Sequence, residues 1–309
     1  MSETIAPRIK GVLAPVVTPF RPDYSPDADR FVRHCRWLCS NNVGLAAFGT
    51  NSEANSLSAD ERMMLLERLV EAGIDPGRMM PGTGCCSLTD TVRLSSHAVK
   101  LGCAGTLMLP PFYYKGVSDE GLYRNFSEVV ERVGDSRLRV YLYHIPPVAQ
   151  VSISIPLIER LLRKYPYSIG GIKDSSGDWN NTKAVLDAFG GSGFDVFVGS
   201  EVFLLANMRA GGAGCISATA NVNPKAIHTL WATWRQADAD AQQATLNAVR
   251  AEFQKRPMIA ALKQAIAHWG AVSAWTTLRP PLVELSEIQR AELIGSLEKL
   301  GFDMPGLTA

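Results

Sequence analysis

Lys173 is the residue of this chain best placed for covalent chemistry. It ends the short apolar run Ile169 to Ile172, and a polar turn containing Gly177 follows it. We interpret the run as a buried strand, where the cationic form of a lysine is costly and the neutral amine can attack a carbonyl. A lysine at a strand end more often extends into water. The hypothesis of a Schiff-base enzyme therefore needs support from the rest of the chain.

Two further apolar runs end in polar groups. Tyr143 ends the run that begins at Val140, and the turn Gly49-Thr50-Asn51-Ser52-Glu53 follows the run Leu45 to Phe48. In a parallel α/β barrel the loops after the strands form one active-site face. We therefore expect an amine, a phenol and a hydroxyl cluster to meet at that face.

The elements that must position these groups alternate along the chain. Each short apolar run is followed by a polar turn and then by ten or more residues with helical periodicity. Eight such units favour a (β/α)8 TIM barrel with right-handed crossovers, and no GxGxxG opens the first helix. The predicted strands lie near Val12 to Val17, Leu45 to Phe48, Met79 to Pro81, Gly105 to Leu109, Val140 to Tyr143, Ile169 to Lys173, Asp195 to Val198 and Gly214 to Ser217.

Helix boundaries and the division of the chain follow from local signals. Ser58 with Glu61 predicts a capping box, and the pairs Ser25-Pro26 and Asn223-Pro224 predict helix starts. We expect residues 1–236 to form the barrel. Residues 237–309 then form a C-terminal helical extension that packs on it and is not an independent domain.

Composition limits the classes of partner. Thirty-one basic and thirty acidic residues give a net charge of +1, with no cluster typical of nucleic-acid or membrane binding. No stretch resembles a signal peptide or a membrane span, so we expect a cytoplasmic protein that binds small molecules. The six cysteines and five histidines show no spacing typical of a metal site. No metal is expected.

Four motifs occur in the order and at the spacing of one known family. They are the turn at 49–53, Pro110-Pro111-Phe112-Tyr113-Tyr114, Tyr143-His144-Ile145-Pro146 and Gly171-Ile172-Lys173-Asp174-Ser175. From Gly11 to about Gly301 the chain resembles the dihydrodipicolinate synthase / N-acetylneuraminate lyase family of class I pyruvate-dependent aldolases.

The resemblance implies catalytic roles. Lys173 would form a covalent imine with pyruvate or a related 2-keto acid, with no other cofactor, while Tyr143 moves protons with help from Thr50. Tyr114 would reach the site of a neighbouring subunit, which implies a homodimer or homotetramer. Thr50 and Asn51 would bind the keto-acid carboxylate.

The same turn departs from the family pattern. Ser52 stands where the family has glycine, and this matters if the position needs a positive φ. Glu53 is interpreted as a structural carboxylate. By strand alternation His144 faces away from the site and is also interpreted as structural. Cys85 and Cys86 follow the third predicted strand and are interpreted as packing residues, with an oxidisable thiol near the substrate as the alternative.

Three positions bear on the second substrate. Val148 replaces the arginine that pairs with the carboxylate of aspartate semialdehyde in dihydrodipicolinate synthases. Sialate lyases bind the sugar with a pair of acidic residues, and this chain has only one of the two, Glu201. Ala218 stands at a position where those lyases have a serine. Val148, Glu201 and Ile216 are the remaining predicted substrate-binding residues, in addition to the two carboxylate-binding residues of the turn. The resemblance therefore favours reversible aldol cleavage of a 4-hydroxy-2-oxoglutarate or 2-keto-3-deoxy sugar acid.

Three alternatives stay open. One is 4-hydroxy-tetrahydrodipicolinate (dihydrodipicolinate) synthase, and another is a keto-acid dehydratase or deaminase that uses the same imine. The third belongs to a different class, a non-catalytic homologue that binds keto acids.

Overall fold

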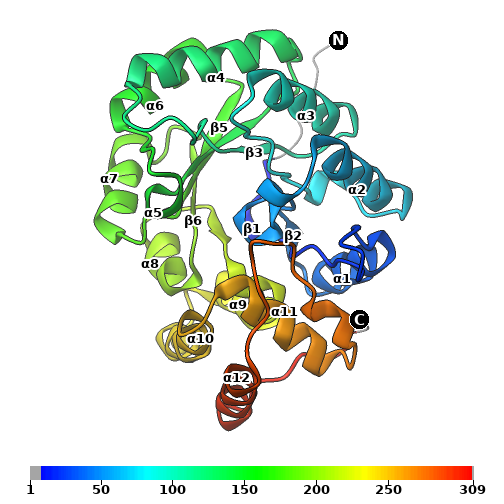
Figure 1. Ribbon diagram of the computed structural model, residues 1–309. Coiled ribbons are helices and arrows are strands. Elements are labelled where there is room, and N and C mark those ends of the chain that lie inside the picture. The colour runs from blue at the N-terminus through cyan, green and yellow to red at the C-terminus, as the bar shows by residue number, and fades with distance from the viewer. Residues whose placement is uncertain (1–7, 308–309) are drawn as a thin grey trace. The chain divides into compact units, whose positions relative to one another are not determined.

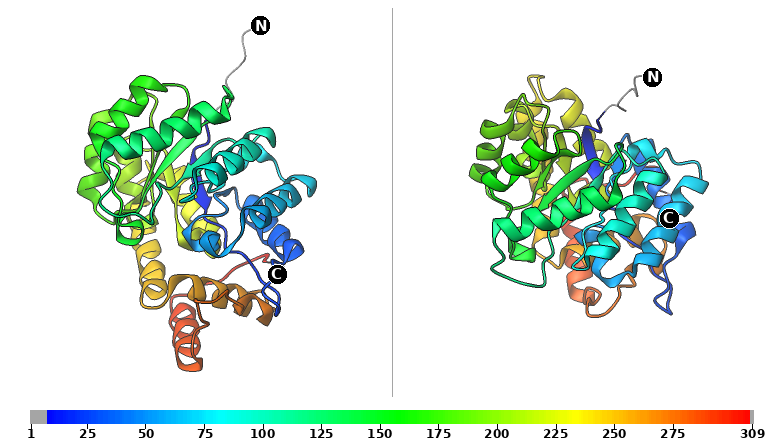
Figure 2. Two further views of the ribbon diagram at one scale, coloured as in Figure 1. Left: turned by 45° about the horizontal axis from the view of Figure 1, so that its top comes forward. Right: turned by 90° about the horizontal axis from the view of Figure 1, so that it is seen from above.

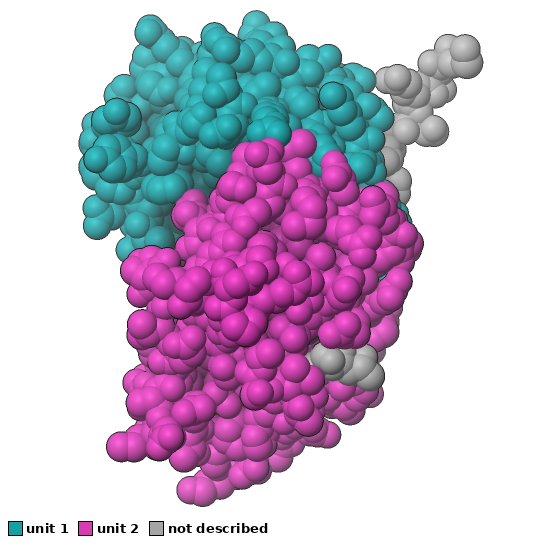
Figure 3. Space-filling model, turned by 45° about the vertical axis from the view of Figure 1, so that its right-hand side comes forward, with its two compact units in different colours: residues 1–10, 75–215 teal, residues 11–74, 216–309 magenta. Residues whose placement is uncertain are grey.

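The computed structural model of the protein describes residues 8–307. These residues form two compact units, shown in different colours in Figure 3. Unit 1 comprises residues 8–10 and 75–215, and unit 2 comprises residues 11–74 and 216–307. The outermost residues of the predicted barrel and extension, 1–7 and 308–309, lie outside the described residues.

Unit 1 contains a parallel sheet whose strand ends carry two of the predicted site residues. Each strand pairs in parallel with its neighbour in the sequence, as expected for strands joined by helical crossovers. The strands, in the spatial order β7-β6-β5-β4-β3, are β3 (Thr106–Met108), β4 (Val140–His144), β5 (Ile169–Asp174), β6 (Asp195–Val198) and β7 (Gly214–Ile216), which ends at the unit boundary.

The helices of unit 1 cover the outer face of this sheet (Figure 1). Phe126, Val129, Ile158 and Leu161 are at most 1% exposed and pack against strand residues such as Ile172 in one apolar core. The helices are α3 (Leu88–Lys100), α4 (Asp119–Val133), α5 (Pro146–Ala149), α6 (Ile155–Lys164), α7 (Trp179–Phe189) and α8 (Leu204–Arg209), with 3-10 turns at Pro76–Arg78 and Glu201–Phe203.

The third predicted strand, Met79 to Pro81, is not a regular strand. The chain there forms a single parallel bridge between Gly82 and Leu107. Leu107 N donates to Pro81 O at 2.8 Å, and Thr83 N donates to Leu107 O at 2.9 Å. Pro81 has no N–H to continue a ladder, so the segment follows a strand path with few of its hydrogen bonds.

Unit 2 combines a short parallel strand pair with helices from both parts of the sequence. Strands β1 (Gly11–Ala14) and β2 (Gly44–Leu45) pair in parallel. The C-terminal helices α10, α11 and α12 pack on one another and are coloured from gold to red in Figure 2. The helices are α1 (Ala28–Ser40), α2 (Ala59–Glu71), α9 (Pro224–Thr233), α10 (Ala239–Gln254), α11 (Met258–Trp269) and α12 (Glu287–Lys299), with 3-10 turns at Thr50–Ser52, Ala54–Ser56, Ala218–Asn221 and Ser273–Thr276.

Most of the predicted helix starts are confirmed. Ser58 and Glu61 form the capping box of α2, and Pro224 is the first residue of α9. The start predicted at Ser25 is wrong, because α1 begins at Ala28 and the Asp27 side chain accepts a hydrogen bond from Arg30 N. Aspartate caps a helix as well as serine does. Within residues 8–307, none of the helices is both long and apolar enough to span a membrane.

Candidate active site

Lys173 and Tyr143 lie next to each other on adjacent strands. They are register partners in β5 and β4, and each side chain is about 2% exposed. Lys173 Nζ lies 4.1 Å from the centroid of the Tyr143 ring. Among residues 8–307, the Lys173 side chain forms no hydrogen bond or ion pair. The predicted pairing of a buried amine with a phenol ring is therefore present within unit 1.

The strand that carries Lys173 requires glycine at two earlier positions. A Cβ on Gly171 would lie 2.2 Å from Asp195 O and 2.9 Å from the Tyr141 ring, and a Cβ on Gly170 would lie 3.2 Å from the same ring. The volume left by these glycines is thus filled by Tyr141, whose hydroxyl donates to Asp195 Oδ2 at 3.1 Å. Burial raises the pKa of Asp195, and Arg8 opposes that shift.

The turn after Lys173 is fixed by its neighbour Asp174. Asp174 Oδ1 accepts from Ser176 N at 2.9 Å, and Oδ2 accepts from Asn181 Nδ2 at 2.9 Å and Thr182 Oγ1 at 2.6 Å. The carboxylate therefore ties the end of β5 to the first turn of α7. This restricts the backbone that carries the amine.

His144 is anchored away from Lys173. Its side chain is buried, and Nδ1 accepts from Ile153 N at 3.0 Å, which holds the loop after β4. Burial lowers the pKa of His144, and the negative charge of Asp174 opposes the shift. A neutral ring that accepts from a backbone amide fits the structural role predicted from strand alternation.

The remaining predicted residues of unit 1 differ in exposure. Glu201 is 1% exposed in the 3-10 turn after β6, whereas Val148 on α5 is 61% exposed. Tyr114 lies in the loop after β3 and is 73% exposed, with its ring 5.3 Å from that of Tyr113. Val148 and Tyr114 thus present apolar surface on unit 1, and Tyr114 forms no contact with Lys173 inside this unit.

Thr50 and Asn51 belong to unit 2, where they start a 3-10 turn that ends at Ser52. Both are partly buried. Ile216 and Ala218 are buried at the start of the second segment of unit 2. Thr50, Asn51 and Ile216 are the predicted carboxylate-binding and substrate-binding groups of this unit.

The concern over Ser52 is resolved by the backbone angles. The residues with positive φ in this turn are Phe48, at 63°, and Glu53, at 56°, so Ser52 needs no glycine-like conformation. Ser52 is fully buried, and its Oγ accepts from Gly49 N at 3.2 Å. Thr18 Oγ1 donates to Ser52 O at 2.7 Å. Serine therefore adds a hydrogen bond across the turn that glycine cannot make.

Glu53 is structural, as expected, but its partners were missed. Lys263 on α11 forms an ion pair with Glu53 Oε1, and both side chains are 0% exposed. Arg279 N donates to Glu53 Oε2 at 3.1 Å. A sequence signal for Lys263 existed: it is a single lysine in the apolar helix segment Ala-Ala-Leu-Lys-Gln-Ala-Ile, the same kind of pattern that singled out Lys173.

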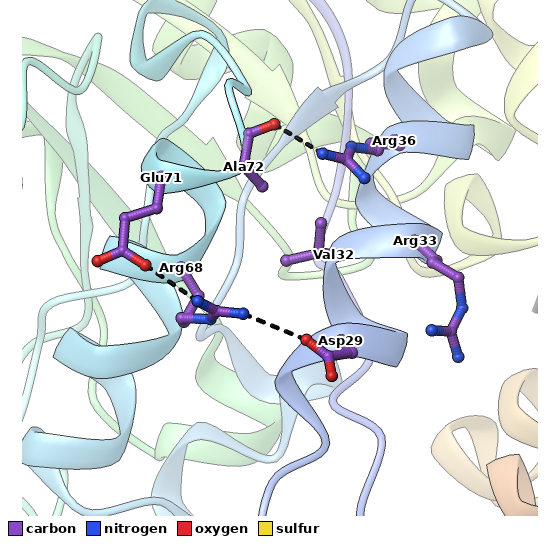
Figure 4. A pocket seen from close by; sticks show the side chains of 7 residues that line it. All are labelled: Asp29, Val32, Arg33, Arg36, Arg68, Glu71 and Ala72. Atoms are coloured by element: carbon purple, nitrogen blue, oxygen red, sulfur yellow. Dashed lines mark hydrogen bonds and ion pairs between the residues drawn. The ribbon is translucent and has the colours of Figure 1, made fainter.

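A charged hollow of about 450 Å³ lies between α1 and α2 (Figure 4). Arg68 is paired there with Asp29 at 3.2 Å and with Glu71 at 3.1 Å, and Arg36 Nη2 donates to Ala72 O at 2.8 Å. The hollow contains none of the predicted site residues. Both carboxylates that line it are paired with Arg68.

The described part of the chain contains no cluster of metal-ligand side chains. No group of three or more His, Cys, Asp or Glu side chains is placed to hold an ion among residues 8–307. The six cysteines are free, and burial raises the pKa of Cys103 to about 12. Cys86 is exposed and Cys85 partly so.

The chain is similar to known proteins over nearly its whole length. It is 34% identical over 294 residues to an uncharacterised DapA-like lyase of Chloroflexus aurantiacus. The aligned region covers 94% of this chain and 97% of that one. The crystal structure of dihydrodipicolinate synthase from Agrobacterium tumefaciens matches with a TM-score of 0.87 at 31% identity, over 94% of this chain and 99% of that one.

A second solved structure matches closely. It is YagE from E. coli, a prophage protein of the dihydrodipicolinic acid synthase family in complex with pyruvate, with a TM-score of 0.88 at 28% identity over 95% of this chain and 99% of that one. The model of the Dihydrodipicolinate synthetase family matches residues 8–300. The chain therefore belongs to the dihydrodipicolinate synthetase family of lyases.

Proposed function

We propose that this lyase cleaves and forms carbon-carbon bonds through a Schiff base between Lys173 and pyruvate. The single observation that carries the proposal is the pair of Lys173 and Tyr143, with a 2% exposed amine 4.1 Å from a phenol ring and no acid in contact with it among residues 8–307. The complex of YagE with pyruvate supports the choice of keto acid. A closed (β/α)8 barrel of residues 1–236 with the extension 237–309 is part of the proposal.

The chemistry follows from this pair. The Lys173 amine attacks C2 of the keto acid, and loss of water from the carbinolamine gives an iminium ion. In the cleavage direction Tyr143 relays the proton of the C4 hydroxyl, taking it up on its oxygen as it passes its own hydroxyl proton on; the C3–C4 bond breaks, and its electrons move to the iminium to give an enamine and an aldehyde. Protonation at C3 and hydrolysis release pyruvate and restore the amine.

For the second substrate we propose a 4-hydroxy-2-oxoglutarate or 2-keto-3-deoxy sugar acid. Val148 supports this because valine offers no charge-assisted pair to the carboxylate of aspartate semialdehyde. Glu201 is the proposed polar contact of the second substrate, and Ile216 is the proposed apolar one. Dihydrodipicolinate synthase activity remains the second candidate, favoured by the A. tumefaciens structure.

Trapping with borohydride tests the covalent step. The protein is reduced in the presence of pyruvate, and one adduct at Lys173 is expected by peptide mass spectrometry. Lys173→Met should remove it. Lys183→Met, which breaks an exposed pair with Asp187 on α7, is the matched control and should retain it. An intact, folded protein that gives no adduct refutes the mechanism.

Product analysis then separates the activities. Pyruvate release is measured with 4-hydroxy-2-oxoglutarate, a 2-keto-3-deoxy acid and N-acetylneuraminate, and condensation of pyruvate with aspartate semialdehyde is measured in parallel. Pyruvate plus an aldehyde indicates aldol cleavage. A keto acid that has lost water or ammonia without pyruvate release indicates the dehydratase or deaminase, and condensation alone indicates the synthase.

We also propose that Tyr114 completes the site of a second subunit. Its 73% exposure beside the 72% exposed Tyr113 leaves two aromatic rings for a partner to cover. Tyr114→Phe should lower turnover about tenfold or more if its hydroxyl moves a proton. Tyr167→Phe, a control at 70% exposure, should not. A protein that sediments as a monomer and is fully active contradicts the shared site.

A further inference from the structure

The turn that carries Thr50 and Asn51 has an unfavourable backbone. Phe48 and Glu53 flank it and both have positive φ, at 63° and 56°. Non-glycine residues in this region cost on the order of 1 kcal/mol or more each, so the surrounding structure must hold them there. Two hydrogen bonds help to keep the turn in this conformation. Gly49 N donates to Ser52 Oγ, and Thr18 Oγ1 donates to Ser52 O.

Further contacts come from α11 and from the loop after the 3-10 turn Ser273–Thr276 of the same unit. The fully buried Glu53 carboxylate receives the ammonium of Lys263 on one oxygen and Arg279 N on the other. Lys263 Nζ also donates to Thr277 O at 2.8 Å and lies 4.6 Å from the centroid of the Phe20 ring. Every donor and acceptor of the pair therefore has a defined partner.

Arg279 holds the following residues as well. Its Nη1 donates to Ser56 O at 2.5 Å, its Nη2 donates to Tyr24 O at 2.8 Å, and its guanidinium forms two hydrogen bonds with Glu61 at the start of α2. This pairing lowers the pKa of Glu61. One arginine thus connects both ends of the segment 53–61 to the chain near residue 279.

Burial of an ion pair removes two charges from water, and this desolvation cost can exceed the free energy gained from their attraction. Replacement of such a pair by apolar residues is often neutral for stability, whereas removal of one partner is costly. The Glu53 pair therefore contributes more to a defined conformation than to net stability, and the segment that it defines begins directly after Thr50, Asn51 and Ser52.

We propose that Lys263 and Arg279 are positioning residues, which fix the Thr50–Asn51 turn through Glu53 in the geometry that binds the keto-acid carboxylate. The inference rests on the proposed function, because it takes the carboxylate role of the turn from there. Lys263 acts only through Glu53 and touches no reacting atom.

The test uses variants that keep the buried site neutral. Glu53→Gln/Lys263→Met removes both charges but leaves an amide oxygen that can accept from Arg279 N. Lys255→Met is the matched control, because it breaks an exposed lysine-glutamate pair with Glu252 on α10. Folding is checked by thermal melting, and pyruvate binding is measured by borohydride trapping over a range of pyruvate concentrations.

A positioning role predicts a split between binding and chemistry. The pyruvate concentration for half-maximal trapping should rise about tenfold or more in the double variant, while the trapping rate at saturation stays within about threefold. Lys255→Met should match the parent protein in both. A folded double variant with unchanged half-saturation overturns the proposal.

Hydrogen exchange separates this inference from the proposed function. Ser52 N, Glu53 N and Ala54 N all donate within the turn, and their exchange should become at least tenfold faster in the double variant. If the parent protein traps no pyruvate, the proposed function fails and this exchange alone decides the positioning role. Unchanged exchange overturns it. If the double variant does not fold, Arg279→Lys is measured with the same expected directions.

Discussion

Two lysines of this protein are buried almost completely, and they have opposite surroundings. Lys173 in unit 1 is 2% exposed beside the Tyr143 ring, with no acid in contact among residues 8–307. Lys263 in unit 2 is 0% exposed and is paired with the carboxylate of Glu53 and the carbonyl of Thr277. Burial alone therefore does not identify a reactive lysine, and the partner of the amine must be known.

The difference has a simple physical basis. A buried ammonium with a carboxylate partner keeps its charge compensated, so the pair is useful for structure. Burial lowers the pKa of Lys263 to about 8, and the negative charge of Glu53 opposes that shift. An amine without such a partner is not held in an ion pair and is available for attack on a carbonyl.

The largest expected effect is that of Lys173→Met. Without the amine no imine forms, and we expect aldol turnover to fall by at least about 10⁴-fold. The melting temperature should stay the same or rise, because an apolar side chain of similar length replaces a buried amine without an ion pair. Substantial turnover, or a large loss of stability, would remove the distinction between the two lysines.

Lys263→Met should act in the opposite sense. It leaves the Glu53 carboxylate buried without its cation, and we expect the free energy of unfolding to fall by about 3–5 kcal/mol. Denaturant titration measures this, and Glu53→Gln/Lys263→Met should regain much of the loss. Additive effects of the two substitutions would show that the pair is not coupled. Lys255→Met should change the value by less than about 1 kcal/mol.

His34 extends the comparison to a buried base without an ion pair in unit 2. Burial lowers its pKa to about 4 from 6.5. Between these values the unfolded chain binds a proton that the folded protein does not, so stability should fall as the pH falls from about 6.5 to 4. The total is on the order of 3 kcal/mol.

His34→Phe isolates this contribution. The phenyl ring keeps an aromatic group near Trp37 and Trp275, whose rings lie 5.7 and 5.2 Å from that of His34. Unfolding free energies of both proteins are measured across the same pH range, and the variant should have the shallower slope. Equal slopes would assign the acid sensitivity to other groups.

Ser52→Ala is expected to have the smallest effect. It removes the bond from Gly49 N to Ser52 Oγ and should cost about 1 kcal/mol of stability. Half-saturation with pyruvate should rise less than in Glu53→Gln/Lys263→Met, because the ion pair still holds Glu53. A larger rise would make the serine, and not the lysine, the main support of the turn.

Local patterns in the sequence predicted much of unit 1. The contact between Lys173 and Tyr143 was predictable, since parallel strands that are neighbours in the sheet bring their ends together. The third strand was overpredicted because an apolar run does not reveal that Pro81 interrupts the ladder. The backbone angles of the turn could not be predicted from the sequence either. The positive φ falls on Glu53, one residue after the serine that replaces glycine.

The residues that hold the turn of the candidate site in place were harder to predict. Lys263 carries the same local signal as Lys173, yet its partner lies 210 positions away and no periodicity connects the two. A pattern can indicate that a lysine is buried. Only the tertiary fold determines whether a carboxylate or a tyrosine ring lies beside it.

The separation between Glu53 and Lys263 also has a consequence for the order of synthesis. Glu53 leaves the ribosome 210 residues before Lys263, and Arg279 follows later still. Until those two residues emerge, the carboxylate has neither partner and cannot be buried at low cost. The turn at 49–53 is therefore completed only after Lys263 and Arg279 have left the ribosome, although domains generally fold from the N-terminus.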